Sequence, residues 1–145
     1  LHVTSPLGKL PEVYADQSKV HQVLFNLVDN AIKFTDQGGV TIKAKVEDGH
    51  LRFFVIDTGK GMSEEAQRLL FHKFQQGADD LLTRDNTQGT GLGLYISKLI
   101  LERMGGSIKL EYSEAHNGTA FSCSLPLADA KPAEPKSGTQ PPATP

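Results

Sequence analysis

Residues 40–57 read VTIKAKVEDGHLRFFVID, and this stretch decides the fold class. From 40 to 46 apolar and polar residues alternate, which is the pattern of a strand with one buried face. Asp48-Gly49 is a strong signal for a tight hairpin turn. The returning run at 51–56 is more continuously apolar, so we expect a central strand that ends at Asp57.

The segment before this hairpin is expected to be helical from Asp16 onward. Asp16 is a favourable N-cap, and apolar residues recur at three- and four-residue steps from 20 to 32. Such a helix should pack its apolar stripe on the sheet. Residues 1–11 predict an irregular N-terminal segment, and 12–15 a short edge strand.

Two more helices and a second hairpin are expected further along the chain. Ser63 precedes two glutamates, which favours a helix start because the helix dipole attracts negative charge there. A third helix is expected over about 91–104, and Gly105-Gly106 should end it. The last hairpin pairs 108–112 with 120–125.

This order of elements predicts an α+β fold, a two-layer α/β sandwich. We expect a mixed, mostly antiparallel sheet of about five strands, covered on one face by three helices. Residues 1–127 should form one domain. Within it, 75–90 are polar without a sustained period and predict a mobile lid. Residues 128–145 are rich in Pro and Ala and predict a disordered tail or linker.

The composition bears on partners and location. A net charge of −2 without a basic run argues against a nucleic-acid partner. No apolar run approaches the ~18 residues of a membrane span, and no signal peptide opens the chain. We therefore expect a cytoplasmic piece without direct membrane contact, whether or not its parent protein is anchored. The single cysteine, Cys123, lies in an apolar run and predicts a small buried side chain.

The first chemical motif is a stripe on the first expected helix. Asn26, Asn30 and Lys33 are four and three residues apart, so they share one helical face. The helical period points that face away from the apolar stripe. It is either a solvated face or a surface for phosphate and metal, because amide oxygens can ligate Mg²⁺ and an ammonium can neutralise a phosphate.

Two glycine-rich motifs follow. Residues 57–62 read DTGKGM directly after the central strand, where a carboxylate can accept from the exocyclic amine of adenine. A turn capped by Asp57 is the other interpretation. Residues 89–94 read GTGLGL before a helix, where freed N–H groups can hold phosphate oxygens. Their spacing and context differ from a dinucleotide-binding fingerprint and from a P-loop.

These motifs, with NLVDNAIKFT at 26–35, FHKF at 71–74 and GTAF at 118–121, resemble the nucleotide-binding boxes and closing strands of sensor histidine kinases. The resemblance covers roughly residues 10–127, in order. It implies a catalytic domain that binds ATP and Mg²⁺ and transfers the γ-phosphate to a histidine on a separate helical dimerisation domain of the same protein. A response-regulator aspartate would receive it next. The isolated domain is expected to be monomeric.

The resemblance also implies a role for individual residues. Asn30 would bind Mg²⁺ with Asn26 beside it, and Lys33 would meet the phosphates. Asp57 would recognise adenine with Thr119 nearby. The remaining nucleotide-binding positions would be Phe34, Gly59, Gly61, Met62, Phe74, Gly89, Thr90, Gly91, Leu92, Gly93 and Leu94. Phe71 and Phe74 would anchor the base of the lid. Plain core packing is the other interpretation, and the two are compatible.

A kinase is favoured over an ATPase at one position. Related ATPases carry a Glu where this chain has Asn26, and loss of such a general base typically costs ~10²–10⁴ in rate. None of the five histidines has the family's acceptor pattern, so the phosphoacceptor must lie elsewhere. Gln75-Gln76 replaces an arginine of many relatives, and Arg84 is the candidate substitute.

Two other functions stay open. The first is a nucleotide-binding module that changes shape without transferring phosphate. The second is a serine-directed kinase of the anti-sigma type, which is disfavoured because those kinases carry Glu where this chain has Asn26.

Overall fold

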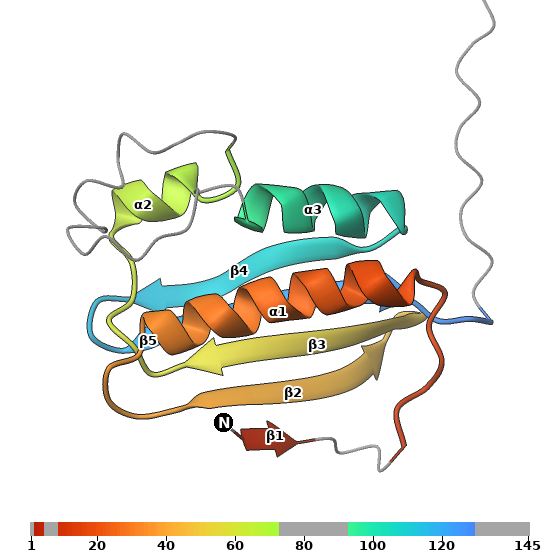
Figure 1. Cartoon of the computed structure of the whole chain (residues 1–145), viewed down its shortest axis with the longest axis horizontal. Coiled ribbons are helices and arrows are strands. Elements are labelled where there is room, and N and C mark those ends of the chain that lie inside the picture. Colours follow the sequence, from red (N-terminus) through yellow and green to blue (C-terminus); the bar gives the residue numbers. More distant parts are fainter. Residues whose placement is uncertain (1, 5–8, 73–92, 130–145) are drawn as a thin grey trace, which may run out of the picture.

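The computed structural model describes residues 2–4, 9–72 and 93–129. These residues form a mixed sheet with the strand order β1-β2-β3-β5-β4, with helices on one face (Figure 1). The pair β1 and β2 is parallel, and the other neighbours are antiparallel. The predicted α+β class is confirmed. The elements are β1 (His2–Thr4), α1 (Gln17–Lys33), β2 (Val40–Glu47), β3 (His50–Asp57), α2 (Glu64–Leu69), α3 (Gly93–Arg103), β4 (Ser107–Glu114) and β5 (Gly118–Pro126).

The hairpin that decided the fold class forms as predicted. Its register runs from Val40 opposite Asp57 to Glu47 opposite His50. The turn residues Asp48 and Gly49 both have positive φ, 51° and 72°, as a two-residue turn that matches the sheet twist requires. β3 lies between β2 and β5, and alternate residues along it are buried.

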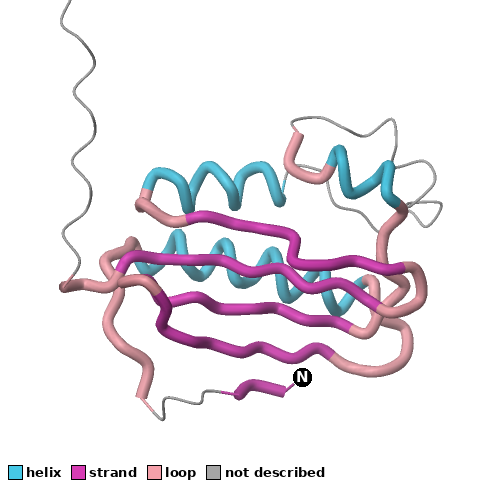
Figure 2. The backbone as a smooth tube through the Cα atoms, turned by 180° about the vertical axis from the view of Figure 1, so that it is seen from behind, coloured by secondary structure: helices cyan, strands magenta, loops and turns pink. Residues whose placement is uncertain are grey.

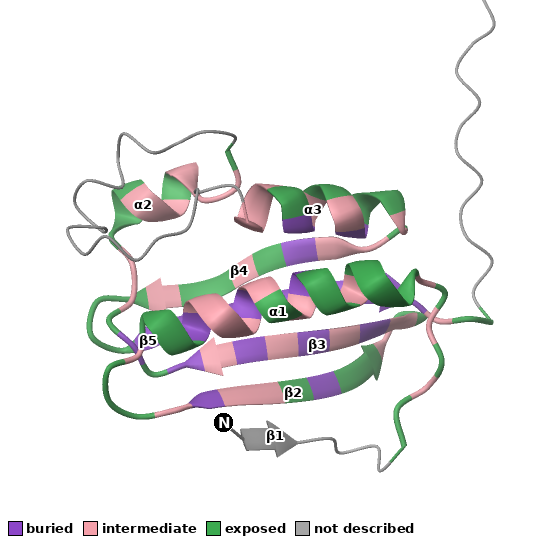
Figure 3. Ribbon diagram, in the orientation of Figure 1, coloured by how far each residue is buried: buried purple, intermediate pink, exposed green. Residues whose placement is uncertain are grey.

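α1 and α3 pack side by side on the same face of the sheet (Figure 1). The opposite face has no described helix over it (Figure 2). In α1 the Asp16 carboxylate caps the first turn by accepting from Ser18 N at 2.9 Å and Lys19 N at 3.2 Å. The buried residues of α1, which lie on its sheet side (Figure 3), are Val23, Leu27 and Ala31.

α3 ends where the double glycine predicts. Gly105 has φ +76°, and Gly106 N donates to Leu101 O at 2.8 Å, so the helix closes with a left-handed residue. The short α2 has no buried residue and lies at one end of the sheet, beyond the start of α3 (Figure 1). Just after α2, the ring of Phe71 packs edge-on against the ring of Phe121, with 6.4 Å between the ring centroids. This contact supports the core-packing interpretation of Phe71.

The predicted edge strand at 12–15 was wrong. That segment forms only an isolated bridge between Val13 and Leu127. One edge strand of the sheet is β1, inside the segment predicted to be irregular, and it pairs with β2 at Thr41, Ile42 and Lys43. The reason is tertiary: without β1, β2 would be an edge strand with unpaired backbone groups. A three-residue strand that pairs in parallel with a distant partner leaves no local signal.

Several predictions fall outside the described residues. They concern the lid at 75–90, the residues Phe74, Gly89, Thr90, Gly91 and Leu92, and the tail beyond Asp129. Within the described part of the chain, no helix combines the length and the apolar character that a membrane crossing needs.

Candidate nucleotide-binding site

The end of β3 carries a buried carboxylate. Asp57 is 6% exposed and lies opposite Thr119 of β5, which is also 6% exposed. Gly59 N donates to Asp57 Oδ1 at 2.9 Å. Burial raises the pKa of Asp57, and hydrogen bonds from the backbone of Gly59 and Thr119 oppose that rise only in part. Because a carboxylate can accept about four hydrogen bonds, this group keeps capacity for a ligand.

The two glycines that follow Asp57 are required by close packing. A Cβ added at Gly59 would collide with the carbonyl oxygen of Phe34. Gly61 has φ +69°, and a Cβ there would collide with the carbonyl oxygen of Glu114. Lys60 N also donates to Phe34 O at 3.2 Å. These contacts tie the loop after β3 both to the end of α1 and to the β4–β5 hairpin.

The same loop is held by two polar residues that the sequence did not indicate. Met62 N donates to Ser113 Oγ at 2.8 Å, and Ser113 Oγ lies 2.8 Å from Thr119 Oγ1. Gln67 Nε2 donates to Met62 O at 3.0 Å and to Ser113 O at 3.1 Å. Neither residue belongs to a motif, because each acquires its role only when α2 and β4 meet the loop.

The predicted stripe on α1 lies off the apolar stripe, but at Asn26 it contacts a neighbouring helix instead of solvent. Asn26 Nδ2 donates to Ser97 Oγ at 3.2 Å, and Ser97 of α3 is only 2% exposed. A Cβ at Gly93 would collide with the Asn26 side chain. The flank of α1 that a helical wheel leaves to solvent is a helix–helix contact, because α3 lies beside α1 on the same sheet face. The sequence shows a polar residue on each helix, Asn26 and Ser97, but it does not show that these two residues pair.

Asn30 and Lys33 follow on the same flank of α1. Asn30 is half-buried, and Lys33 Nζ pairs with Asp29 Oδ2 at 2.8 Å. Lys33 is 45% exposed, so it remains accessible to a ligand. In the described ranges, no three His, Cys, Asp or Glu side chains gather as metal ligands. The Asn30 amide still fits Mg²⁺, because this ion is commonly held by one or two protein oxygens together with phosphate.

The described site residues gather at one end of the molecule. The C-terminal end of α1, the end of β3 and the start of α3 lie at the same end (Figure 1). Phe34, 40% exposed, connects the first two, since it caps α1 and contacts the loop after Asp57. Leu94, near the start of α3, packs on the core.

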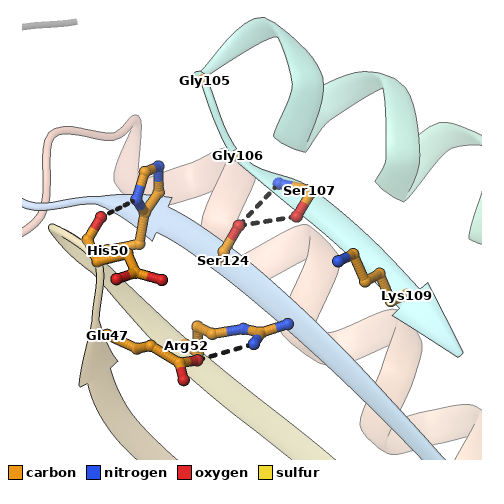
Figure 4. Close-up of a pocket in the computed structure, with 9 residues that line it drawn as sticks. Glu47, His50, Arg52, Gly105, Gly106, Ser107, Lys109 and Ser124 are labelled. Carbon is orange, nitrogen blue, oxygen red and sulfur yellow. Dashed lines mark hydrogen bonds and ion pairs between the residues drawn. The ribbon is translucent and has the colours of Figure 1, made fainter. Parts of the chain in front are cut away.

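A hollow of about 300 Å³ lies at the opposite end of β3 (Figure 4). Within it, Arg52 pairs with Glu47 at 2.9 Å, and Ser107 Oγ lies 2.9 Å from Ser124 Oγ. None of the predicted site residues lines it; the lining residues are Glu47, Asp48, His50, Arg52, Gly105, Gly106, Ser107, Lys109 and Ser124. This hollow is therefore separate from the candidate nucleotide site.

Residues 15–129 match the family described as histidine kinase-, DNA gyrase B-, and HSP90-like ATPases. The chain belongs to this family. Among its relatives is the Sensor protein GacS of Pseudomonas syringae pv. syringae, 45% identical over 121 residues, which cover 80% of this chain and 13% of GacS.

Solved structures of the family agree. Full-length ShkA in complex with AMPPNP superimposes with a TM-score of 0.69 at 36% identity, over 89% of this chain and 26% of ShkA. The nucleotide-free catalytic domain of the histidine kinase ThkA gives 0.62 at 36% identity, over 78% of this chain and 69% of that one. The chain thus corresponds to the ATP-binding catalytic domain of sensor histidine kinases, and it spans a minor part of the larger relatives.

Proposed function

We propose that this domain binds ATP with Mg²⁺ and presents the γ-phosphate to a histidine on a separate helical dimerisation domain of the same protein. The observation that carries the proposal is the buried Asp57 carboxylate beside Thr119. Burial disfavours a charged carboxylate, so the group is costly unless a donor meets it. The exocyclic amine of adenine is such a donor.

The phosphates would lie toward α1 and α3. Lys33 would contribute positive charge, and the N-terminus of α3 at Gly93 would contribute its helix dipole. Asn30 would hold Mg²⁺ through its amide oxygen, and the ion would offset phosphate charge during transfer. We predict that the glycines at 89 and 91 and the lid at 75–90 complete the site.

Asn26 supports a kinase rather than a hydrolase. Its amide is engaged with Ser97 and packs against Gly93, so position 26 holds α1 and α3 together. An amide cannot take a proton from water, and loss of a general base typically lowers a rate by ~10²–10⁴. The domain would then keep ATP intact until an imidazole arrives. The histidine would pass the phosphate on to the aspartate of a response regulator.

The proposal is tested with the 145-residue chain, Mg·ATP and the parent's dimerisation domain. We expect saturable ATP binding, slow hydrolysis by the chain alone, and acid-labile label on the dimerisation domain after addition of γ-labelled ATP. At ATP concentrations near the wild-type Kd, Asp57→Asn should strongly reduce the transfer, whereas Asp36→Asn, at an exposed position, should not.

Two results would contradict the proposal. Hydrolysis as fast as that of a dedicated ATPase would mean that position 26 does not suppress attack by water. Normal ATP binding without any label on the dimerisation domain would favour the nucleotide-binding module that works by changing shape.

A further inference from the structure

A line of hydrogen-bonding groups connects the loop after β3 to Thr119. Met62 N donates to Ser113 Oγ at 2.8 Å, and the Ser113 and Thr119 hydroxyl oxygens are 2.8 Å apart. Ser113 of β4 and Thr119 of β5 are partners in the sheet register, which brings both hydroxyls to the same face. The carbonyl oxygen of Gly118 lies 3.4 Å from Ser113 Oγ.

The direction of this line depends on which oxygen receives the single Ser113 proton. A backbone amide can only donate, so Ser113 Oγ accepts from Met62 and keeps one proton of its own to donate. The Thr119 oxygen is at a normal O–H···O distance from Ser113, whereas Gly118 O is at a long one. The Ser113 proton can go to either oxygen. When it goes to Thr119 Oγ1, the nearer one, the Thr119 proton is free to point to a ligand.

Gln67 holds this arrangement in place. Its Nε2 donates to the carbonyl oxygens of Met62 and Ser113, one on each side of the hydrogen bond between them. The loop and β4 are thus fastened together by a third element, α2. This fastening restrains Ser113 beside Thr119, which lowers the cost of ordering the Thr119 hydroxyl when a ligand binds.

We propose that Ser113 is a positioning residue that sets the preference of this site for adenine over guanine. The inference rests on the proposed nucleotide function. Asp57, an acceptor, and Thr119, a donor, are register partners on neighbouring strands. On the Watson–Crick edge, adenine presents its amine donor beside the N1 acceptor, whereas guanine presents its O6 acceptor beside an N1–H donor. The pair matches adenine at both positions and guanine at neither.

The test compares Kd values of the whole chain for Mg·ATP, Mg·GTP and the Mg complex of purine riboside triphosphate, which keeps the ring acceptor but lacks the amine. The variants are Ser113→Ala and Ser113→Thr. Ser107→Ala is the matched control, because Ser107 Oγ lies 2.9 Å from Ser124 Oγ at the other end of the same strand pair.

Ser113→Ala should raise the Kd for Mg·ATP about three- to tenfold, which corresponds to one neutral hydrogen bond, and should leave the Kd for Mg·GTP unchanged. The preference for ATP should fall by that factor. The amine-free analogue should bind the wild-type chain less tightly than ATP, yet lose the same factor in Ser113→Ala, because the Thr119 contact remains in it. Ser113→Thr and Ser107→Ala should keep the wild-type preference.

An equal loss for ATP and GTP in Ser113→Ala would overturn the inference, because Ser113 would then only brace the fold. An unchanged ATP affinity would overturn it as well. Partial unfolding cannot imitate the expected result, because it lowers the binding of every nucleotide by the same factor. If the wild-type chain binds no nucleotide, the proposed function itself fails. If the wild-type chain binds ATP and Ser113→Ala keeps the wild-type preference for ATP over GTP, the inference alone fails.

Discussion

Replacing Asp57 with asparagine should change nucleotide affinity and stability in opposite directions. The two side chains have nearly the same shape, and the asparagine Oδ1 can still accept from Gly59 N, a hydrogen bond of 2.9 Å in the wild-type chain. The substitution therefore removes the charge of a carboxylate that is only 6% exposed and replaces its second acceptor oxygen with an NH2 donor.

The effect on affinity follows from the hydrogen bond to adenine. A hydrogen bond to a charged group contributes about 1.5–3 kcal/mol, more than a neutral one. Its loss corresponds to about a 10- to 150-fold increase in the Kd for Mg·ATP. Only ionised Asp57 accepts from the amine in this way. Wild-type affinity should therefore also fall as the pH drops through the raised pKa of Asp57, and the Asp57→Asn variant should lack that component.

The effect on stability has the other sign. Burial raises the pKa of Asp57 in the folded chain above its ordinary value of 3.8. Such a group stabilises the fold only in its protonated form, below the unfolded pKa, and this contribution is lost as the pH rises through the folded pKa. At about pH 7 the charge is a cost to the unliganded domain. Asp57→Asn should therefore be at least as stable as wild type near neutrality.

Titration calorimetry with Mg·ATP and urea unfolding of the unliganded chain, both over about pH 5–8, measure the two effects. Asp36→Asn, at an exposed loop position, is the control and should change neither. An Asp57→Asn variant that binds ATP normally would refute the adenine contact. One that is clearly less stable at neutral pH would show that Asp57 serves mainly as the cap of the turn.

Three further substitutions and reactions are informative. Gly93→Ala places a methyl group against the α1 amide that packs on it and should cost about 1–3 kcal/mol in urea unfolding, whereas Gly39→Ala, with open space around it, should cost far less. Leu101→Ala removes a fully buried side chain and should cost about 2–5 kcal/mol, while Leu99→Ala, 36% exposed on the same helix, should cost much less; equal losses would contradict the packing. Burial raises the pKa of the Cys123 thiol to about 12, so a thiol reagent at about pH 8 should label it only as fast as the domain unfolds, and rapid labelling of the native chain would argue against this core.

Local signals were sufficient for much of the fold. The Asp16 cap, the turn at Asp48-Gly49 and the helix end at Gly105-Gly106 each depend on residues within a few positions of one another. Sequence spacing therefore contains the information directly. The family resemblance rests on similar short runs, which is why the nucleotide motifs could be recognised before any contact was known.

Local signals failed where the partner is distant. β1 is a strand only because it pairs with β2, about forty positions along the chain, and three residues are too few to show a strand pattern of their own. The helical period placed Asn26 away from the apolar stripe of its own helix, but a helical wheel contains no neighbouring helix. It contacts Ser97, which is 71 positions later.

By itself, the sequence determined which residue types are present for nucleotide chemistry and which helices and strands carry most of them. Only the tertiary structure decided which polar atoms meet. Asp57 and Thr119 become neighbours through the pairing of β3 with β5, and Ser113 reaches Met62 through the pairing of β4 with β5. The physical reason is that a hydrogen bond depends on distance and direction in space, which strand register sets and sequence separation does not.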